Sequence, residues 1–197
     1  RKSHRTKVWL FLVCFLISSA VVFAVDVVFD KGLEQHQKDR IEVLLGKKED
    51  LKGVGYNVNQ SKIAIGSGGF VGKGFLNGTQ TKYNFVPEQD TDFIFCTIGE
   101  EWGFIGSSIT IILFLTLCIR LVKMAERQRS KFARIYGYGV ASIIFFHFFV
   151  NIGMTIGLLP VIGIPLPFIS YGGSSLWAFT LLLFIFIRQD ASRLELI

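Results

Sequence analysis

The chain has 197 residues, of which 51% are hydrophobic and only 18% are charged, and its mean hydropathy is +0.49. A soluble chain of this size would carry more charge and show amphipathic periodicity, so the composition indicates an integral membrane protein. The formal net charge of +6 does not indicate a nucleic-acid-binding protein, because no basic patch with interleaved aromatic residues is present in the sequence.

Four apolar stretches are long enough, or nearly so, to cross a bilayer as helices, which takes about 20 residues. They are Val8–Phe29, Phe104–Val122, Tyr136–Leu159 and Phe168–Ile187, the last interrupted by Gly172 and Gly173. The first has the basic flank of a signal peptide, but its apolar part is too long and no small-residue cleavage site follows, so we expect a retained span. The predicted fold is therefore an all-α polytopic membrane protein.

Basic residues concentrate in two short segments, the tail before residue 8 and the connection 123–134 between the second and third spans. Short loops rich in Lys and Arg stay on the cytoplasmic side. We therefore expect both termini in the cytoplasm. Residues 1–29 would form a tail and the first span, and 30–103 a large loop on the outer face. Residues 104–197 would form three spans with a cytoplasmic basic loop, a re-entrant Pro/Gly segment and a cytoplasmic tail.

The predicted outer loop has two different halves. Asp30–Lys52 is charged and has few breakers, which predicts an interfacial or solvated helix. Gly53–Gly78 contains eight glycines, a density that allows positive φ and close approach of the backbone to a ligand, and we expect a loop there. A P-loop is excluded, because Ser67 stands where its first glycine should be and a glycine follows Lys73. A loop whose exposed backbone N–H groups hold an anion remains an alternative.

The most informative stretch is Phe85–Phe95, which places Glu88, Asp90 and Asp92 in a short run directly before a predicted span. A carboxylate at the edge of an apolar run is partly desolvated, so its pKa rises and it can act as a base. We therefore predict that Asp92 is the centre of the chemistry. For Asp90 we favour a solvated turn with helix capping near Thr91.

A polar pair interrupts the third predicted span. His147 and Asn151 are four residues apart, so they share a helix face. Lipid offers no hydrogen bonds, and such a pair therefore indicates a cavity or a partner helix. A lone histidine in this setting is more often a structural hydrogen-bonding residue than a catalyst.

The segment Leu159–Ser175 holds three of the four prolines, so it cannot be one helix. Apolar but non-helical backbone near a membrane is buried in protein or lines a cavity. Ser170, Tyr171, Ser174 and Ser175 are suitable cavity-lining donors. The alternative interpretation is a tight re-entrant connector.

Five motifs occur in one order along the chain. They are Gln60–Gly69 (QSKIAIGSGG), Pro87–Phe95 (PEQDTDFIF), Gly99–Glu101 (GEE), Asn151–Met154 (NIGM) and Ile169–Ser175 (ISYGGSS). Together they closely resemble the SEDS family (shape, elongation, division and sporulation) of bacterial peptidoglycan polymerases. The run GKG at 72–74 followed by GTQ at 78–80 is more similar to the elongation branch, RodA, than to the division branch, FtsW, which stays an alternative.

The resemblance implies a fold of about ten transmembrane helices, of which this chain looks like only the last four plus the large extracellular loop. We expect the chain to be part of a longer protein. One departure is visible, because Asp90 stands where the family usually has a histidine.

The resemblance also implies a reaction, the polymerisation of lipid II into glycan strands during cell elongation and cell-shape maintenance. Lipid II is a disaccharide-pentapeptide on undecaprenyl pyrophosphate. By position Asp92 matches the residue regarded as catalytic, either as the base for the attacking sugar hydroxyl or as ligand of a divalent cation, with Mg²⁺ expected. Glu88 would orient substrate or metal, and Lys73 and Lys62 are candidate partners of the pyrophosphate. The other predicted substrate-binding residues are Ser170, Ser174, Ser175, His147 and Asn151.

The location implied is the bacterial inner (cytoplasmic) membrane, and the partner implied is a class B penicillin-binding protein. Two other functions suit the same features. The cavity could translocate lipid II, as polar intramembrane residues and broken helices also suit transport, or the protein could be a scaffold for its partner. The enzyme is favoured because Asp92 falls at the predicted outer face and not at the bilayer midplane.

Overall fold

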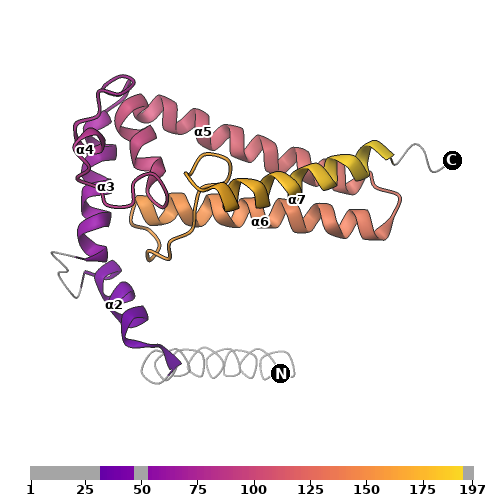
Figure 1. Cartoon of the computed structure of the whole chain (residues 1–197), viewed down its shortest axis with the longest axis horizontal. Helices are drawn as coiled ribbons and strands as arrows, with labels where there is room; N and C mark the ends of the chain where they lie inside the picture. Colours follow the sequence, from indigo (N-terminus) through magenta and orange to yellow (C-terminus); the bar gives the residue numbers. More distant parts are fainter. Residues whose placement is uncertain (1–31, 47–52, 193–197) are drawn as a thin grey trace, which may run out of the picture. The chain divides into compact units, whose positions relative to one another are not determined.

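The structure is a computed structural model that describes residues 32–46 and 53–192, and the regular elements within these ranges are helices (Figure 1). They are α2 (Gln35–Leu44), α3 (Val54–Gly68), α4 (Thr79–Lys82), α5 (Ile94–Glu126), α6 (Lys131–Thr155) and α7 (Gly173–Ser192). The predicted all-α content is therefore confirmed for this part of the chain. The predicted first span, Val8–Phe29, lies outside the described residues.

The chain divides into two compact units, Arg1–Lys48 and Glu49–Ile197. The described part of the first unit contains α2, at whose start the backbone N–H of Glu34 donates to the side-chain oxygen of Gln37 (3.1 Å). No residue of α2 is buried. The predicted helix in Asp30–Lys52 is thus confirmed for Gln35–Leu44, and its open surface agrees with a solvated or interfacial position.

In the second unit α5, α6 and α7 run side by side, and α3 packs across one end of them against α5 and α6 (Figure 1). The core between the long helices is apolar, and Phe114 of α5 stacks on Phe148 of α6 with ring centroids 4.9 Å apart. Phe186 of α7 is fully buried against Gly137 of α6, where a Cβ would overlap its ring. Small residues of this kind let membrane helices approach closely.

Two of the described helices, α5 and α6, are long and apolar enough to cross a membrane. They correspond to the predicted second and third spans, although α5 begins earlier, at Ile94, and α6 ends earlier, at Thr155. The predicted fourth span was wrong at its start. The backbone is not helical before Gly173, so the apolar stretch of α7 is shorter than the predicted span and ends before Arg188.

The predicted glycine-rich loop was wrong for its first half, because Val54–Gly68 forms α3. Ser61, Ala64 and Gly68 are buried at spacings of three and four, so they lie on one helix face. A Cβ at Gly68 would overlap the carbonyl oxygen of Gly99 in α5. The small residues of this segment therefore serve close helix packing and not chain flexibility.

The second half of the glycine-rich segment completes a break in α5. Gly103 has φ 62° and ψ −157°, which interrupts the helix. In a continuous helix the N–H groups of Phe104 and Ile105 would donate to the carbonyls of Glu100 and Glu101. Instead they donate to the turn 69–74, and that turn in exchange donates to the two carbonyls.

The exchange consists of four backbone hydrogen bonds. They are Phe104 N to Gly69 O (2.9 Å), Ile105 N to Phe70 O (3.2 Å), Lys73 N to Glu100 O (3.0 Å) and Gly74 N to Glu101 O (2.9 Å). Non-helical backbone at a membrane boundary needs such internal partners. The turn 69–74 is consequently bonded to the α5 backbone on both sides of the break at Gly103.

This exchange makes Gly72 intolerant of a side chain. Its φ is +86°, and a Cβ would overlap the carbonyl of Glu101. We expect Gly72→Ala to lower the free energy of unfolding by about 1–3 kcal/mol, the usual cost of overpacking. Thermal unfolding in detergent measures this. Gly139→Ala is the control, because nothing lies within 4 Å of its Cβ position in α6; equal loss in both variants would contradict the hydrogen-bond exchange.

Candidate functional site

The acidic run forms a tight turn just before α5. Glu88 has φ 54°, and its carbonyl oxygen accepts from the backbone N–H groups of Asp92 (3.0 Å) and Phe93 (3.2 Å). A non-glycine residue in this region costs on the order of 1–3 kcal/mol and persists where its surroundings determine it, often at functional sites. Phe93, only 1% exposed, anchors the turn in a small apolar cluster with Met154 and Val161.

Three successive carbonyl groups of this turn are held by the second half of the chain. The carbonyl of Asp90 accepts from Tyr171 N (2.8 Å), that of Thr91 from Ser170 Oγ (2.6 Å) and that of Asp92 from Asn151 Nδ2 (2.8 Å). We call this set the carbonyl clasp. Since it contacts the backbone of three neighbouring residues, it fixes both the position and the direction of the turn.

Two members of the clasp also order the connection between α6 and α7. Asn151 is fully buried and donates a second bond to the carbonyl of Ile164 (2.8 Å). Ser170 Oγ accepts from the backbone N–H of Leu166 (2.7 Å). Both residues were predicted to bind substrate, and the contacts that the structure gives them are with backbone. The predicted interruption of helix in Leu159–Ser175 is confirmed, and these contacts favour the interpretation as a re-entrant connector.

The side chain of Asp92 is partly buried beside this connector. A Cβ at Gly163, whose φ is +78°, would lie 3.1 Å from Oδ2 of Asp92. Burial raises the pKa of Asp92 above its ordinary value, the negative charge of Glu88 raises it further, and a hydrogen bond with Thr91 opposes the shift. A carboxylate with a raised pKa holds a proton more strongly and is therefore a better base.

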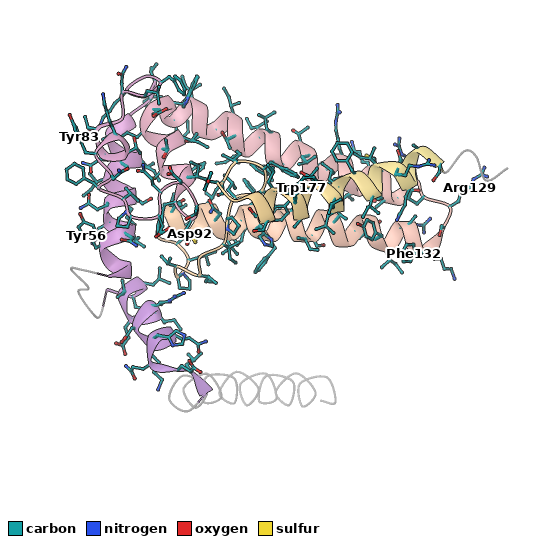
Figure 2. The ribbon with its side chains drawn as sticks, in the orientation of Figure 1. Tyr56, Tyr83, Asp92, Arg129, Phe132 and Trp177 are labelled. Atoms are coloured by element: carbon teal, nitrogen blue, oxygen red, sulfur yellow. The ribbon has the colours of Figure 1, made fainter. Side chains whose placement is uncertain are left out.

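A small polar cavity of about 330 Å³ lies next to the same turn. It is lined by Asn84, Val86, Pro87, Glu88, Gln89, Asp90, Thr91 and Tyr171. Figure 2 shows Asp92 among the loops at the end of the bundle where α3 lies, far from Arg129 at the other end. The acidic turn therefore combines a partly buried carboxylate with adjoining space for a polar ligand.

The structure places Lys73 in a different network. Its ammonium lies 2.7 Å from the carboxylate of Glu100, which is fully buried, and also donates to Thr79 Oγ1 (2.8 Å). Glu100 in addition accepts from the backbone N–H groups of Gln80 (2.9 Å) and Thr81 (2.9 Å). This ion pair fastens α4 and the glycine-rich turn to α5, so Lys73 has a structural role here.

The other predicted residues lie apart from one another. Lys62 is exposed on α3, and its side chain lies against Gly157. His147 Nδ1 contacts the carbonyl of Ile143 in its own helix (2.9 Å), and its ring packs edge-on against Phe179 at 5.0 Å. These positions agree with the structural interpretation of the histidine.

The two serines at the start of α7 are not part of the clasp. Ser174 is exposed, and Ser175 Oγ donates to the carbonyl of Gly172 (2.9 Å) within its own turn. The structure thus brings Glu88, Asp92, Asn151 and Ser170 together and leaves the remaining predicted residues elsewhere.

Sequence reasoning missed Glu100 and Gly163. Glu100 belongs to a recognised motif, and its charge so close to an apolar run was the available signal for a buried carboxylate with a cationic partner such as Lys73. Gly163 carried no signal, because only the folded connector places it against Asp92.

No group of three or more His, Cys, Asp or Glu side chains that could hold a metal ion occurs within residues 32–46 and 53–192. Mg²⁺ is commonly held by one or two carboxylates together with substrate phosphates. Asp92 and Glu88, which are close enough for the charge of one to raise the pKa of the other, fit that mode.

The carbonyl clasp predicts unequal effects at two serines of one segment. Ser170→Ala leaves the Thr91 carbonyl and the Leu166 N–H without their partner, which should lower the free energy of unfolding by about 1–3 kcal/mol. Ser174→Ala, at an exposed position, should change it little. Thermal unfolding of both variants in detergent tests this. An unchanged unfolding temperature in Ser170→Ala would show that the clasp does not stabilise the fold.

Known proteins resemble this chain in sequence over most of its length. The sequence model of the FtsW/RodA/SpoVE family, described as a cell cycle protein, matches residues 3–194. The peptidoglycan glycosyltransferase MrdB of Escherichia coli K12 is 47% identical over 144 residues, which is 73% of this chain and 39% of the relative. The peptidoglycan glycosyltransferase RodA of Treponema pallidum is 43% identical over 145 residues, 74% of this chain and 34% of the relative. The chain thus spans well under half the length of these relatives.

Solved structures agree with this similarity. A chain of a peptidoglycan synthase complex, studied for its coordination of polymerization and crosslinking, superposes with a TM-score of 0.70 at 29% identity, over 94% of this chain and 50% of that chain. A mutant of the rod shape determining protein RodA of Thermus thermophilus gives a TM-score of 0.53 at 33% identity, over 62% of this chain and 38% of that chain. With sequence motifs, helical fold and family match in agreement, the chain belongs to the FtsW/RodA/SpoVE, or SEDS, family of polytopic membrane proteins, and it is RodA-like.

Proposed function

We propose that this chain is the catalytic part of a peptidoglycan glycosyltransferase that polymerises lipid II during cell elongation. The observation that carries the proposal is the placement of Asp92, a partly buried carboxylate with a raised pKa, held by the carbonyl clasp at one end of a membrane-spanning bundle. The curated relatives named above are peptidoglycan glycosyltransferases, which supports the same reaction class.

In the proposed reaction a sugar hydroxyl of one lipid-linked unit attacks the anomeric carbon of another. The new C–O bond forms as the bond to the pyrophosphate breaks, and the hydroxyl proton passes to the carboxylate of Asp92. A base of raised pKa suits this transfer at neutral pH. Burial and the charge of Glu88 together raise that pKa, and the clasp holds the backbone of the turn that carries Asp92.

The departing pyrophosphate needs positive charge. In the alternative role of Asp92, this residue and Glu88 would hold Mg²⁺, which would neutralise the phosphate oxygens. Lys62 is exposed near the start of the α6–α7 connection and is a candidate second cation. Lys73 is less suitable, since its ammonium is paired with Glu100.

We infer that the Asp92 end of the bundle faces outward from the cytoplasm. The connection between α5 and α6, which carries Arg129, lies at the opposite end (Figure 2). Short basic loops stay cytoplasmic. Cysteines placed at Tyr83 and at Arg129 should then react with a membrane-impermeant reagent from opposite sides of the membrane, and reaction from the same side would contradict this orientation.

A class B penicillin-binding protein is the proposed partner. The similar solved chain belongs to a peptidoglycan synthase complex, which supports an assembly of this kind. α5 and α6 leave exposed apolar side chains on which a single partner helix could pack. Co-purification of the intact protein in mild detergent tests this, and full polymerase activity of the protein isolated alone would argue against a required partner.

Replacement of the proposed base gives a direct test of the reaction. Asp92→Asn keeps the shape of the side chain but removes its charge, so polymerisation of labelled lipid II by the intact protein should fall by about 10²–10⁴-fold. Unfolding temperature should change little. Wild-type activity in Asp92→Asn at equal amounts would remove Asp92 from the mechanism. Exchange of lipid II between leaflets without glycan synthesis would support the transporter hypothesis instead.

The raised pKa of Asp92 predicts the acidic side of the pH profile. Asp92 acts only when deprotonated, so activity declines as pH falls through its pKa. Glu88→Gln removes a like charge and lowers that pKa, which should move the decline to lower pH. Asp90→Asn is the control, because Asp90 is not among the causes of the shift. An unmoved profile in Glu88→Gln would contradict the influence of the Glu88 charge on the titrating group.

A further inference from the structure

The turn after α3 and the start of α5 together expose a group of large apolar side chains. We call it the aromatic patch, and it consists of Phe70, Val71, Phe75, Leu76, Trp102 and Phe104. Their exposed fractions run from 55% for Trp102 to 76% for Val71. Phe70 lies against Phe104 with ring centroids 5.5 Å apart, and Phe75 lies against Trp102 at 6.4 Å. Contiguous exposed apolar surface of this kind marks an interaction site.

The patch is presented by a fixed backbone. The turn that carries Phe70 and Val71 is bound to α5 by the four exchanged hydrogen bonds around Gly103. The pair of Lys73, in this turn, and Glu100, in α5, adds a side-chain bond of 2.7 Å. The apolar side chains therefore do not extend from a loose loop that could fold back to bury them.

The length of the uncharged run in α5 indicates how deep the aromatic patch lies relative to the bilayer. The run from Phe104 to Ile119 contains no charged residue, with Glu101 before it and Arg120 after it. Its 16 residues span about 24 Å at 1.5 Å per residue, whereas the hydrocarbon core is about 30 Å thick. Measured from Arg120, the edge of the hydrocarbon core therefore lies at Phe104 or farther toward the Asp92 end. This is the level of the aromatic patch.

We propose that the aromatic patch inserts into the boundary between headgroups and acyl chains of the lipid leaflet at the Asp92 end of the bundle. Trp and other aromatic side chains prefer this region, and burial of the exposed apolar area is favourable there. Glu100 tolerates the low polarity because Lys73 neutralises it and backbone N–H groups satisfy its second oxygen. The patch holds the turn after α3 against the membrane surface, independently of any catalytic role of Asp92.

The test measures lipid contact at single labelled sites of the intact protein. Phe75→Cys is labelled with an environment-sensitive fluorophore in liposomes of phosphatidylethanolamine and phosphatidylglycerol. Tyr83→Cys is the matched control, because Phe75 and Tyr83 are equally exposed, at 68%, and Tyr83, at the C-terminal end of α4, packs its ring against Phe85 and not against a residue of the patch. Val71→Cys provides a second patch site in case one variant folds poorly, and protein without an added cysteine gives the background.

Quenching by lipids with a shallow spin label should be several-fold stronger at Phe75 and Val71 than at Tyr83, and quenching by aqueous iodide should be several-fold weaker. Equal iodide quenching at all three sites would show a solvated patch and overturn the proposal. Protection from both quenchers would show that protein covers the patch, which would overturn it as well. Since no outcome depends on glycan synthesis, the result is separate from that of Asp92→Asn.

Discussion

The exchange of backbone hydrogen bonds at Gly103 is the interaction on which the second unit depends. A transmembrane helix cannot break near the bilayer unless its freed N–H and C=O groups find partners. The turn 69–74 supplies both acceptors and donors, and therefore joins the glycine-rich segment to α5. The break changes the direction of α5 before its apolar run begins. The acidic turn and α3 are consequently built on the first part of α5, apart from the part that crosses the membrane.

The glycines of this region follow from the same constraint. Gly72 and Gly103 have positive φ, and a Cβ on either would collide with backbone on the opposite side of the exchange. Gly68 allows α3 to touch α5 at Gly99. The density of glycines, which in isolation suggests a flexible or anion-binding loop, instead reflects backbone-to-backbone packing.

The candidate site is assembled from segments that are far apart in sequence. Asp92 is close to α5, but its backbone is fixed by Asn151 of α6 and by the connector that contains Ser170. The burial that raises the pKa of Asp92 also depends on this connector, because Gly163 lies against its carboxylate. A change in the α6–α7 connection would therefore reach the carboxylate directly. Rigid support of this kind is what a positioned base requires.

Hydropathy and proline positions were enough to predict the membrane class, two of the spans and the helix interruption in Leu159–Ser175. These properties depend on hydropathy and on the backbone limits of proline, which act locally. Asp92 could be singled out for the same reason, since a carboxylate beside an apolar run is visible in one dimension. The family motifs supplied the chemistry that these local patterns suggest.

The roles of the glycines and of the polar residues in the second half depend on contacts between distant segments, which became visible in the folded chain. Whether Gly68 flexes a loop or permits a helix contact depends on a neighbour 31 positions away, Gly99. Whether Asn151 and Ser170 contact a ligand or the backbone depends on where the acidic turn lies. Lys73 was predicted to contact the pyrophosphate, but the packing of the glycine-rich turn on α5 pairs it with Glu100. Hydrogen-bond partners between distant segments are set by the packing of helices, and a local pattern does not encode that packing.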